Sequence, residues 1–197
     1  MDRSLTQTGE LIRYSEAELF ARRPSAAEFE SDRGVSVTYG PDDNNISAIL
    51  VALDGPFIEP VIIRRPEPAL LALIFIGQAT SSHSEQLMAK ALLTDTRIYL
   101  QTIAADLVKT LNNSASNLKV LELVDGPPPQ LGERSSTARA RISSGTDMFE
   151  SRLLVVEHES LLIVMAQITN TNQTESPNML NDSAIVRSIL ITAIPRG

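Results

Sequence analysis

His83 and His158 are the only residues of this sequence that could act as imidazole bases or imidazole metal ligands. His158 lies between Glu157 and Glu159 in the run "VVEHESLL", which is expected to form the tip of a β-hairpin. Adjacent strand residues point to opposite faces, so these three side chains would chelate a metal poorly. His83 is expected at the start of a helix, facing solvent. We therefore expect both histidines to be solvent-exposed and to have no catalytic or metal-binding role.

Metal and cofactor signatures are lacking elsewhere in the sequence. The run "DDNN", Asp42–Asn45, offers the oxygen ligands that calcium prefers but lacks the spacing and the distal bidentate glutamate of a calcium loop, so a plain turn is expected. The sequence contains no cysteine, which removes disulfides, thiolate zinc sites and cysteine nucleophiles. It contains no Walker loop, no dinucleotide-binding glycine turn and no G-x-S-x-G elbow. We therefore expect no metal and no cofactor, and the scarcity of His, Cys and Trp argues against an enzyme.

Arginine provides the most suggestive pattern. In "TARARIS", Arg139 and Arg141 are two residues apart on an expected strand, so they share a face and lie about 7 Å apart. Guanidinium groups bind carboxylates through paired hydrogen bonds. The group Arg134, Arg139, Arg141 and Arg152 therefore predicts a docking face for an acidic partner, and the alternative is an exposed sheet face balanced by neighbouring glutamates.

A second candidate is the segment "DGPPPQLGE". Its three consecutive prolines, Pro127, Pro128 and Pro129, forbid a helix and favour an extended, exposed loop. Such a loop is either a recognition surface or a stiff connector.

Charge and hydropathy restrict the partners. A net charge of −7 argues against affinity for nucleic acid, which requires clustered Lys and Arg. The most apolar run, Ala69–Ala79, is far shorter than the roughly 20 residues that span a bilayer, so no membrane span is expected. The first residues do not resemble a secretory signal, which predicts a cytoplasmic protein, or an exported one if a signal peptide has been removed.

The stretch Arg139–Thr169 is the most informative about the fold. It alternates polar and apolar residues at first and then becomes apolar on both faces, in a hairpin with its bend at Glu157–Ser160. A strand that is apolar on both faces must be covered on both sides. The chain therefore moves from the edge of a sheet towards its centre, between two layers of helices. The apolar positions that should alternate between the layers are Leu161, Ile163 and Met165 against Leu162, Val164 and Ala166.

Other elements follow from periodicity and turn residues. We expect a long amphipathic helix over 84–111 with a break at Thr94–Thr96, begun by a capping box of Ser82 and Glu85. A closing helix in "SPNMLNDSAIVRSIL" is expected to begin at Ser176, before Pro177. The remaining expected elements are strands at Val35–Tyr39, Ala69–Gly77 and Leu118–Val124, and a hairpin made of "ISAILVALDG" and "FIEPVIIRRP".

These elements predict an α+β fold, a mainly antiparallel sheet covered by helices on both faces. Residues 35–197 are expected to form a single α/β/α domain. Residues 1–34 are expected to be an N-terminal extension or a first helix of the same domain.

The order of a long helix, a strand, a loop, a three-stranded meander and a closing helix resembles the PsbP-like family over about residues 83–191. The residues that carry this resemblance are the strand "LLIVMAQIT" and the closing "IVRSIL". The resemblance implies an α/β/α sandwich and a non-enzymatic role, since members are mostly photosystem accessory subunits, lipoproteins and secretion-system chaperones. No catalytic residues carry over, and the lipid-bearing cysteine of a lipoprotein is lacking.

We therefore expect a non-catalytic binding or accessory protein that acts on a protein partner through a sheet face or groove. The alternatives are a cytoplasmic chaperone or adaptor of a secretion system, and a cofactor-less enzyme with a cavity of Asp, Glu, Arg or Tyr residues. The oligomeric state is left open by the sequence.

Overall fold

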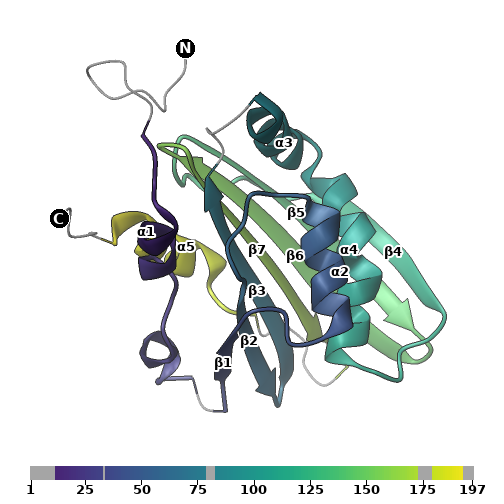
Figure 1. The fold of residues 1–197 in the computed structure, drawn as a ribbon. Coiled ribbons are helices and arrows are strands. Elements are labelled where there is room, and N and C mark those ends of the chain that lie inside the picture. Colours follow the sequence, from purple (N-terminus) through teal and green to yellow (C-terminus); the bar gives the residue numbers. More distant parts are fainter. Residues whose placement is uncertain (1–11, 33, 79–82, 173–178, 193–197) are drawn as a thin grey trace.

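The computed structural model describes residues 12–32, 34–78, 83–172 and 179–192. Within these ranges the chain forms one sheet of seven strands in the order β1-β2-β3-β7-β6-β5-β4, with every neighbouring pair antiparallel (Figure 1). The strands are β1 (Ser36–Tyr39), β2 (Val61–Pro66), β3 (Ala69–Gln78), β4 (Leu118–Asp125), β5 (Arg134–Ser144), β6 (Asp147–His158) and β7 (Leu161–Asn170). The helices are α1 (Glu16–Ala21), the 3-10 turn η1 (Ala26–Phe29), α2 (Asn44–Leu53), α3 (His83–Thr94), α4 (Thr96–Leu111) and α5 (Asp182–Ile191).

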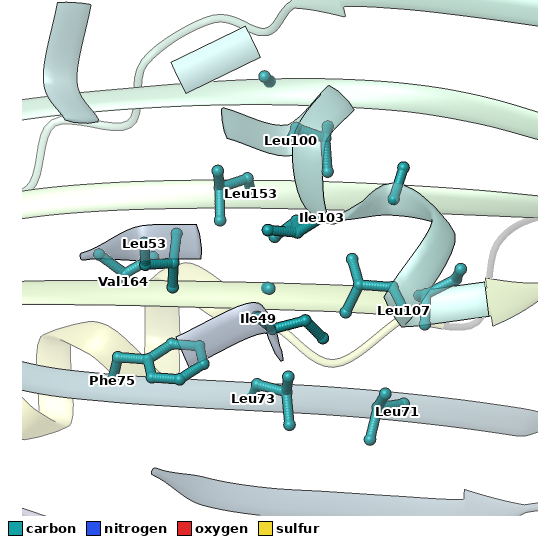
Figure 2. Packing of buried hydrophobic residues seen from close by; sticks show 14 of the residues in the cluster. Ile49, Leu53, Leu71, Leu73, Phe75, Leu100, Ile103, Leu107, Leu153 and Val164 are labelled. Atoms are coloured by element: carbon teal, nitrogen blue, oxygen red, sulfur yellow. The ribbon is translucent and has the colours of Figure 1, made fainter. Parts of the chain in front are cut away.

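Helices cover both faces of this sheet, as the sequence predicts. On one face α2, α3 and α4 pack over the strands, and Figure 2 shows Ile49 of α2 and Ile103 of α4 in one cluster with Leu73 and Val164 of the sheet. On the other face α1, η1 and α5 bury a second cluster, which includes Leu19, Phe29 and Val186. The fold is therefore an α+β sandwich with an antiparallel sheet between two helical layers.

The central hairpin β6–β7 confirms the two-sided pattern. In β7, Leu162, Val164 and Ala166 belong to the cluster under α2–α4. Leu161, Ile163 and Met165 belong to the cluster under α1 and α5, and all six are almost fully buried. Because β7 lies at the centre of the sheet, neither of its faces is exposed to solvent.

The hairpin expected from "ISAILVALDG" and "FIEPVIIRRP" is wrong. Residues Asn44–Leu53 form α2, because the Asp43 side chain caps the helix by accepting from the Ile46 N–H at 2.9 Å. Asp54 then ends the helix in the left-handed region, at φ 46°. Hence "DDNN" begins a helix instead of forming a plain turn. The hairpin in this region is β2–β3.

The predicted break in the long helix is confirmed, whereas the predicted start of the closing helix is wrong. The long helix does break at Asp95, between α3 and α4, while Ser82 of its expected capping box lies outside the described residues. The closing helix begins at Asp182, because Asn181 is its N-cap and accepts from the Ala184 N–H at 3.1 Å. The expected start at Ser176 is therefore wrong, and Ser176 itself lies outside the described residues.

The N-terminal elements contribute to the second helical layer. Leu19 of α1 and Phe29 of η1 are buried in it, and the Arg22 guanidinium donates from Nη1 to the Ile189 carbonyl of α5 at 2.9 Å. The division of the chain at residues 34 and 35 stays a prediction. No helix in the described part of the chain is long and apolar enough to cross a membrane.

Candidate binding site on the arginine face

The outward face of β5 and β6 brings two of the predicted arginines together. Arg139 of β5 lies directly opposite Arg152 of β6 in the antiparallel register, and Arg141 lies opposite Glu150. These side chains are on the sheet face that carries α5, because Ala138, Ala140 and Ile142, which alternate with them along β5, pack under α4. We call the three residues Arg139, Arg141 and Arg152 the arginine face.

The fourth predicted arginine is not part of this face. Arg134 is at an even-numbered position of β5, so it points to the side of α3 and α4, where it forms an ion pair with Glu157. The sequence grouped it with the others by proximity along the chain, whereas the alternation of the strand separates them.

The three arginines of the face differ in their partners. Arg152 contacts Asp182 at the start of α5, with 3.3 Å between Nη1 and Oδ2, and this carboxylate is only 12% exposed. Arg141 approaches Glu122 of β4 at 4.0 Å, and both side chains are exposed. Arg139 is exposed and has no ion pair with any residue that the structure describes. One guanidinium of the face is therefore held in place and another is open to an incoming anion.

A pocket of about 330 Å³ lies where this face meets the proline loop and the start of α5. Arg139, Arg152 and Leu154 come from the strands, and Asp182 comes from α5. Pro127 and Pro129 form the opposite wall. The structure therefore brings together two candidate sites that the sequence analysis treated separately, the arginines and the proline loop.

The loop wall is anchored at both ends. At its start the Gly126 N–H donates to the Thr137 carbonyl at 2.9 Å, and a Cβ on Gly126 would lie 2.7 Å from Thr137 Cγ2. Ser135 donates from its hydroxyl to the Pro129 carbonyl, and the Leu131 side chain is buried. The wall is thus formed before any ligand arrives, which lowers the entropy lost on binding.

Pro128 lies on the other side of the loop. There it lines a wider groove of about 740 Å³ with Leu93, Thr94 and Arg134. Pro129 borders both hollows. The three prolines therefore form a ridge between two hollows, and of these only the smaller one is lined by Arg139 and Arg152.

Two carboxylates line the pocket, and each has an arginine partner. Asp182 contacts Arg152, and Asp125 lies 3.9 Å from Arg97. The sequence did not indicate either aspartate as part of a site, although the alternation of β6 does place Arg152 and Leu154 on one face. Among the described residues no three His, Cys, Asp or Glu side chains are grouped as metal ligands.

The histidines lie away from this pocket. His83 is the first residue of α3 and is exposed, as expected. His158 ends β6 beside the predicted turn at Glu159–Ser160, but its ring is half-buried and not solvated as expected. Its Nδ1 is buried and makes no hydrogen bond within the described part of the chain.

Comparison with known families and with curated proteins gives no match. Among solved structures, the chain is similar to the extracellular domain of PknH from Mycobacterium tuberculosis. The TM-score is 0.44 and the identity is 10%, over 90% of this chain and 95% of that chain. The site described above therefore rests on its own geometry.

Proposed function

We propose that this chain is a non-catalytic binding protein whose arginine face and proline loop take an acidic segment of a partner protein. The observation that carries this proposal is that Arg139 of β5 and Arg152 of β6 lie directly opposite each other in the strand register and both line the pocket. Two neighbouring guanidinium groups suit a carboxylate, to which each can donate two hydrogen bonds.

The surrounding charge supports a local docking place. The chain carries a net charge of −7, so an acidic partner is repelled by the molecule as a whole. Arg139 and Arg141 are exposed positive charges on the α5 side of the sheet. An acidic segment would therefore be held at this face and disfavoured elsewhere.

The pocket is less suited to acid–base catalysis. Its two carboxylates, Asp125 and Asp182, each have a guanidinium within 4 Å instead of facing each other as an acid and a base. We therefore prefer a binding protein to an enzyme.

We also propose that the chain is a distant PsbP-like domain. The resemblance rests on the order of α3 and α4, then β4, a loop, the meander β5–β6–β7 and the closing α5, and the chain has this order. The mostly non-enzymatic character of that family agrees with a binding role.

The proposal is tested with a fluorescently labelled glutamate-rich peptide and a glutamine-rich peptide of equal length. We expect saturable binding of the acidic peptide, measured by fluorescence anisotropy, that weakens as salt screens the charges. Replacing both Arg139 and Arg141 by Ala removes the charge-assisted hydrogen bonds to the peptide and should raise the Kd by about tenfold or more. A tenfold increase in Kd corresponds to a loss of about 1.4 kcal/mol of binding free energy.

Lysines provide the matched control. Lys90 of α3 and Lys109 of α4 are exposed on the other helical layer, so changing both to Ala removes the same charge from the far side. If this pair weakens binding as much as the arginine pair, the effect is one of net charge and the proposal fails. Unchanged binding in the arginine double variant would also overturn it.

A further inference from the structure

We propose that β4 pairs with β4 of a second copy of this chain, antiparallel and about a two-fold axis near Leu121. This inference concerns the edge of the sheet and does not require the proposed function, although Glu122 of β4 also contacts Arg141 of the arginine face.

β4 is an open edge. It is the last strand in the sheet order, and within the described ranges it pairs only with β5. The backbone groups on its outer side are therefore a template for another strand. Two adjacent apolar residues lie at its middle, Val120, which is 42% exposed, and Leu121, which is 55% exposed. Figure 1 shows β4 along the outer border of the sheet.

A bulge gives this strand an unusual symmetry. Val120 pairs with Ile142, but the next paired residue is Glu122, opposite Arg141, so Leu121 is an extra residue. Before the bulge, Lys119 pairs with Ser143. Because Ser143 and Arg141 are two residues apart on β5, Lys119 and Glu122 lie on the same sheet face despite their odd spacing.

The same reasoning applies to the leucines on either side. Leu118 pairs with Ser144 and Leu123 with Ala140, so both leucines lie on the face that packs under α4. The sequence "LKVLEL" therefore presents leucine, then lysine, on one side of the bulge and glutamate, then leucine, on the other, with matching faces.

A two-fold axis through the bulge makes this order self-complementary. Lys119 of one copy then lies opposite Glu122 of the other, and this contact occurs twice. Leu118 lies opposite Leu123 on the other face, and the exposed Val120 and Leu121 are covered at the centre. Opposite charges and apolar side chains directly across a strand pair stabilise it. A shift of register by one residue would place lysines or leucines opposite side chains of the wrong face.

Bulges and edge lysines also serve in other proteins to keep edge strands apart. That role predicts a monomer, whereas the pairing of Lys119 with Glu122 predicts a dimer whose stability depends on the two opposite charges. Reversing the charge of Lys119 or of Glu122 distinguishes the monomer from the dimer.

The first experiment measures the dimer dissociation constant by sedimentation equilibrium over a wide range of protein concentration. We expect a reversible dimer. Lys119→Glu places like charges opposite each other twice and should raise the Kd by about tenfold or more. Glu122→Lys should do the same, and the double exchange Lys119→Glu with Glu122→Lys should restore the original Kd within about threefold. A monomer at every concentration, or single reversals that leave the dimer unchanged, would overturn the proposal.

The second experiment uses the lack of native cysteine. Leu121→Cys places a single thiol close to the proposed axis, so mild oxidation should link two chains into a covalent dimer. Val51→Cys is the matched control, because Val51 is 76% exposed on α2, away from the edge. Equal yields of linked dimer from the two variants would show random collision and contradict the interface.

Discussion

Gln167 holds Leu180 by both ends of its side-chain amide. Its Oε1 accepts from the Leu180 N–H at 2.9 Å, and its Nε2 donates to the Leu180 carbonyl at 3.2 Å. Gln167 is buried in β7, and Leu180 precedes the cap of α5. This one side chain therefore replaces the hydrogen bonds that a neighbouring strand would give to the backbone at residue 180.

Gln167→Ala should lower the free energy of unfolding by about 2–4 kcal/mol, because it leaves two buried backbone groups without partners. Urea unfolding followed by circular dichroism measures this change. Gln101→Ala is the control, since Gln101 is exposed on α4 and its loss should change stability by about 0.5 kcal/mol or less. Equal effects of the two variants would contradict the role of Gln167.

Ile163→Asp should prevent folding. Ile163 is fully buried in the central strand, so the substitution places an unpaired charge in an apolar cluster. The expected loss exceeds about 4 kcal/mol, and far-UV circular dichroism should show an unfolded chain. Ile191→Asp makes the same chemical change at a residue that is 75% exposed, and it should leave the spectrum unaltered. A folded Ile163→Asp protein would mean that β7 is not covered on both faces.

Replacing both Arg139 and Arg141 by Ala should change the free energy of unfolding by about 0.5 kcal/mol or less, since exposed ion pairs stabilise proteins little. Arg65→Ala is the contrasting variant. Its guanidinium is buried, and it donates to the Pro68 carbonyl at 3.0 Å and lies 3.3 Å from Asp32. This loss should cost about 2 kcal/mol or more. Thermal unfolding of the two variants side by side tests whether the arginine face is free of a structural role, and similar losses would show that it is not.

Alkaline pH should destabilise the protein partly through Tyr99. Burial raises the pKa of the Tyr99 phenol above 10.0, and the negative charges of Asp95 and Asp54 raise it further. The unfolded chain therefore loses this proton at lower pH than the folded chain, so stability falls as the pH rises above about 10. In Tyr99→Phe this part of the fall should be missing. Urea unfolding at about pH 9 and about pH 11 measures it, and an identical fall in both proteins would contradict the prediction.

Local pattern was sufficient to predict the central strands. In β7 the apolar residues continue without a gap, and in β5 the residues alternate, so the period of two and the loss of the wet face are both visible in the sequence. The helix α2 was missed because "ISAILVAL" is rich in β-branched residues, although Asp43 stands at its start as an N-cap. The start of α5 was missed because Ser176 and Asn181 are both acceptable caps.

The site could be predicted only in part. That Arg139 and Arg141 share a face follows from strand alternation alone. That Arg139 meets Arg152 depends on the register of β5 with β6, which the short turn around Gly145 fixes. The pocket requires, in addition, that the proline loop and Asp182 come together from segments more than fifty residues apart, and no local pattern contains that information.

The contact between Arg22 and the Ile189 carbonyl joins the earliest and the latest of the described helices. When the ribosome makes this protein, α1 emerges long before α5 exists. One face of the sheet, which includes Leu154 and Ile163, is therefore covered only in part, by α1 and η1, until nearly all the described residues have been synthesised. A nascent chain that stalls before Asp182 would expose that apolar face, and we expect chaperones to bind the arrested chain more strongly than the completed one.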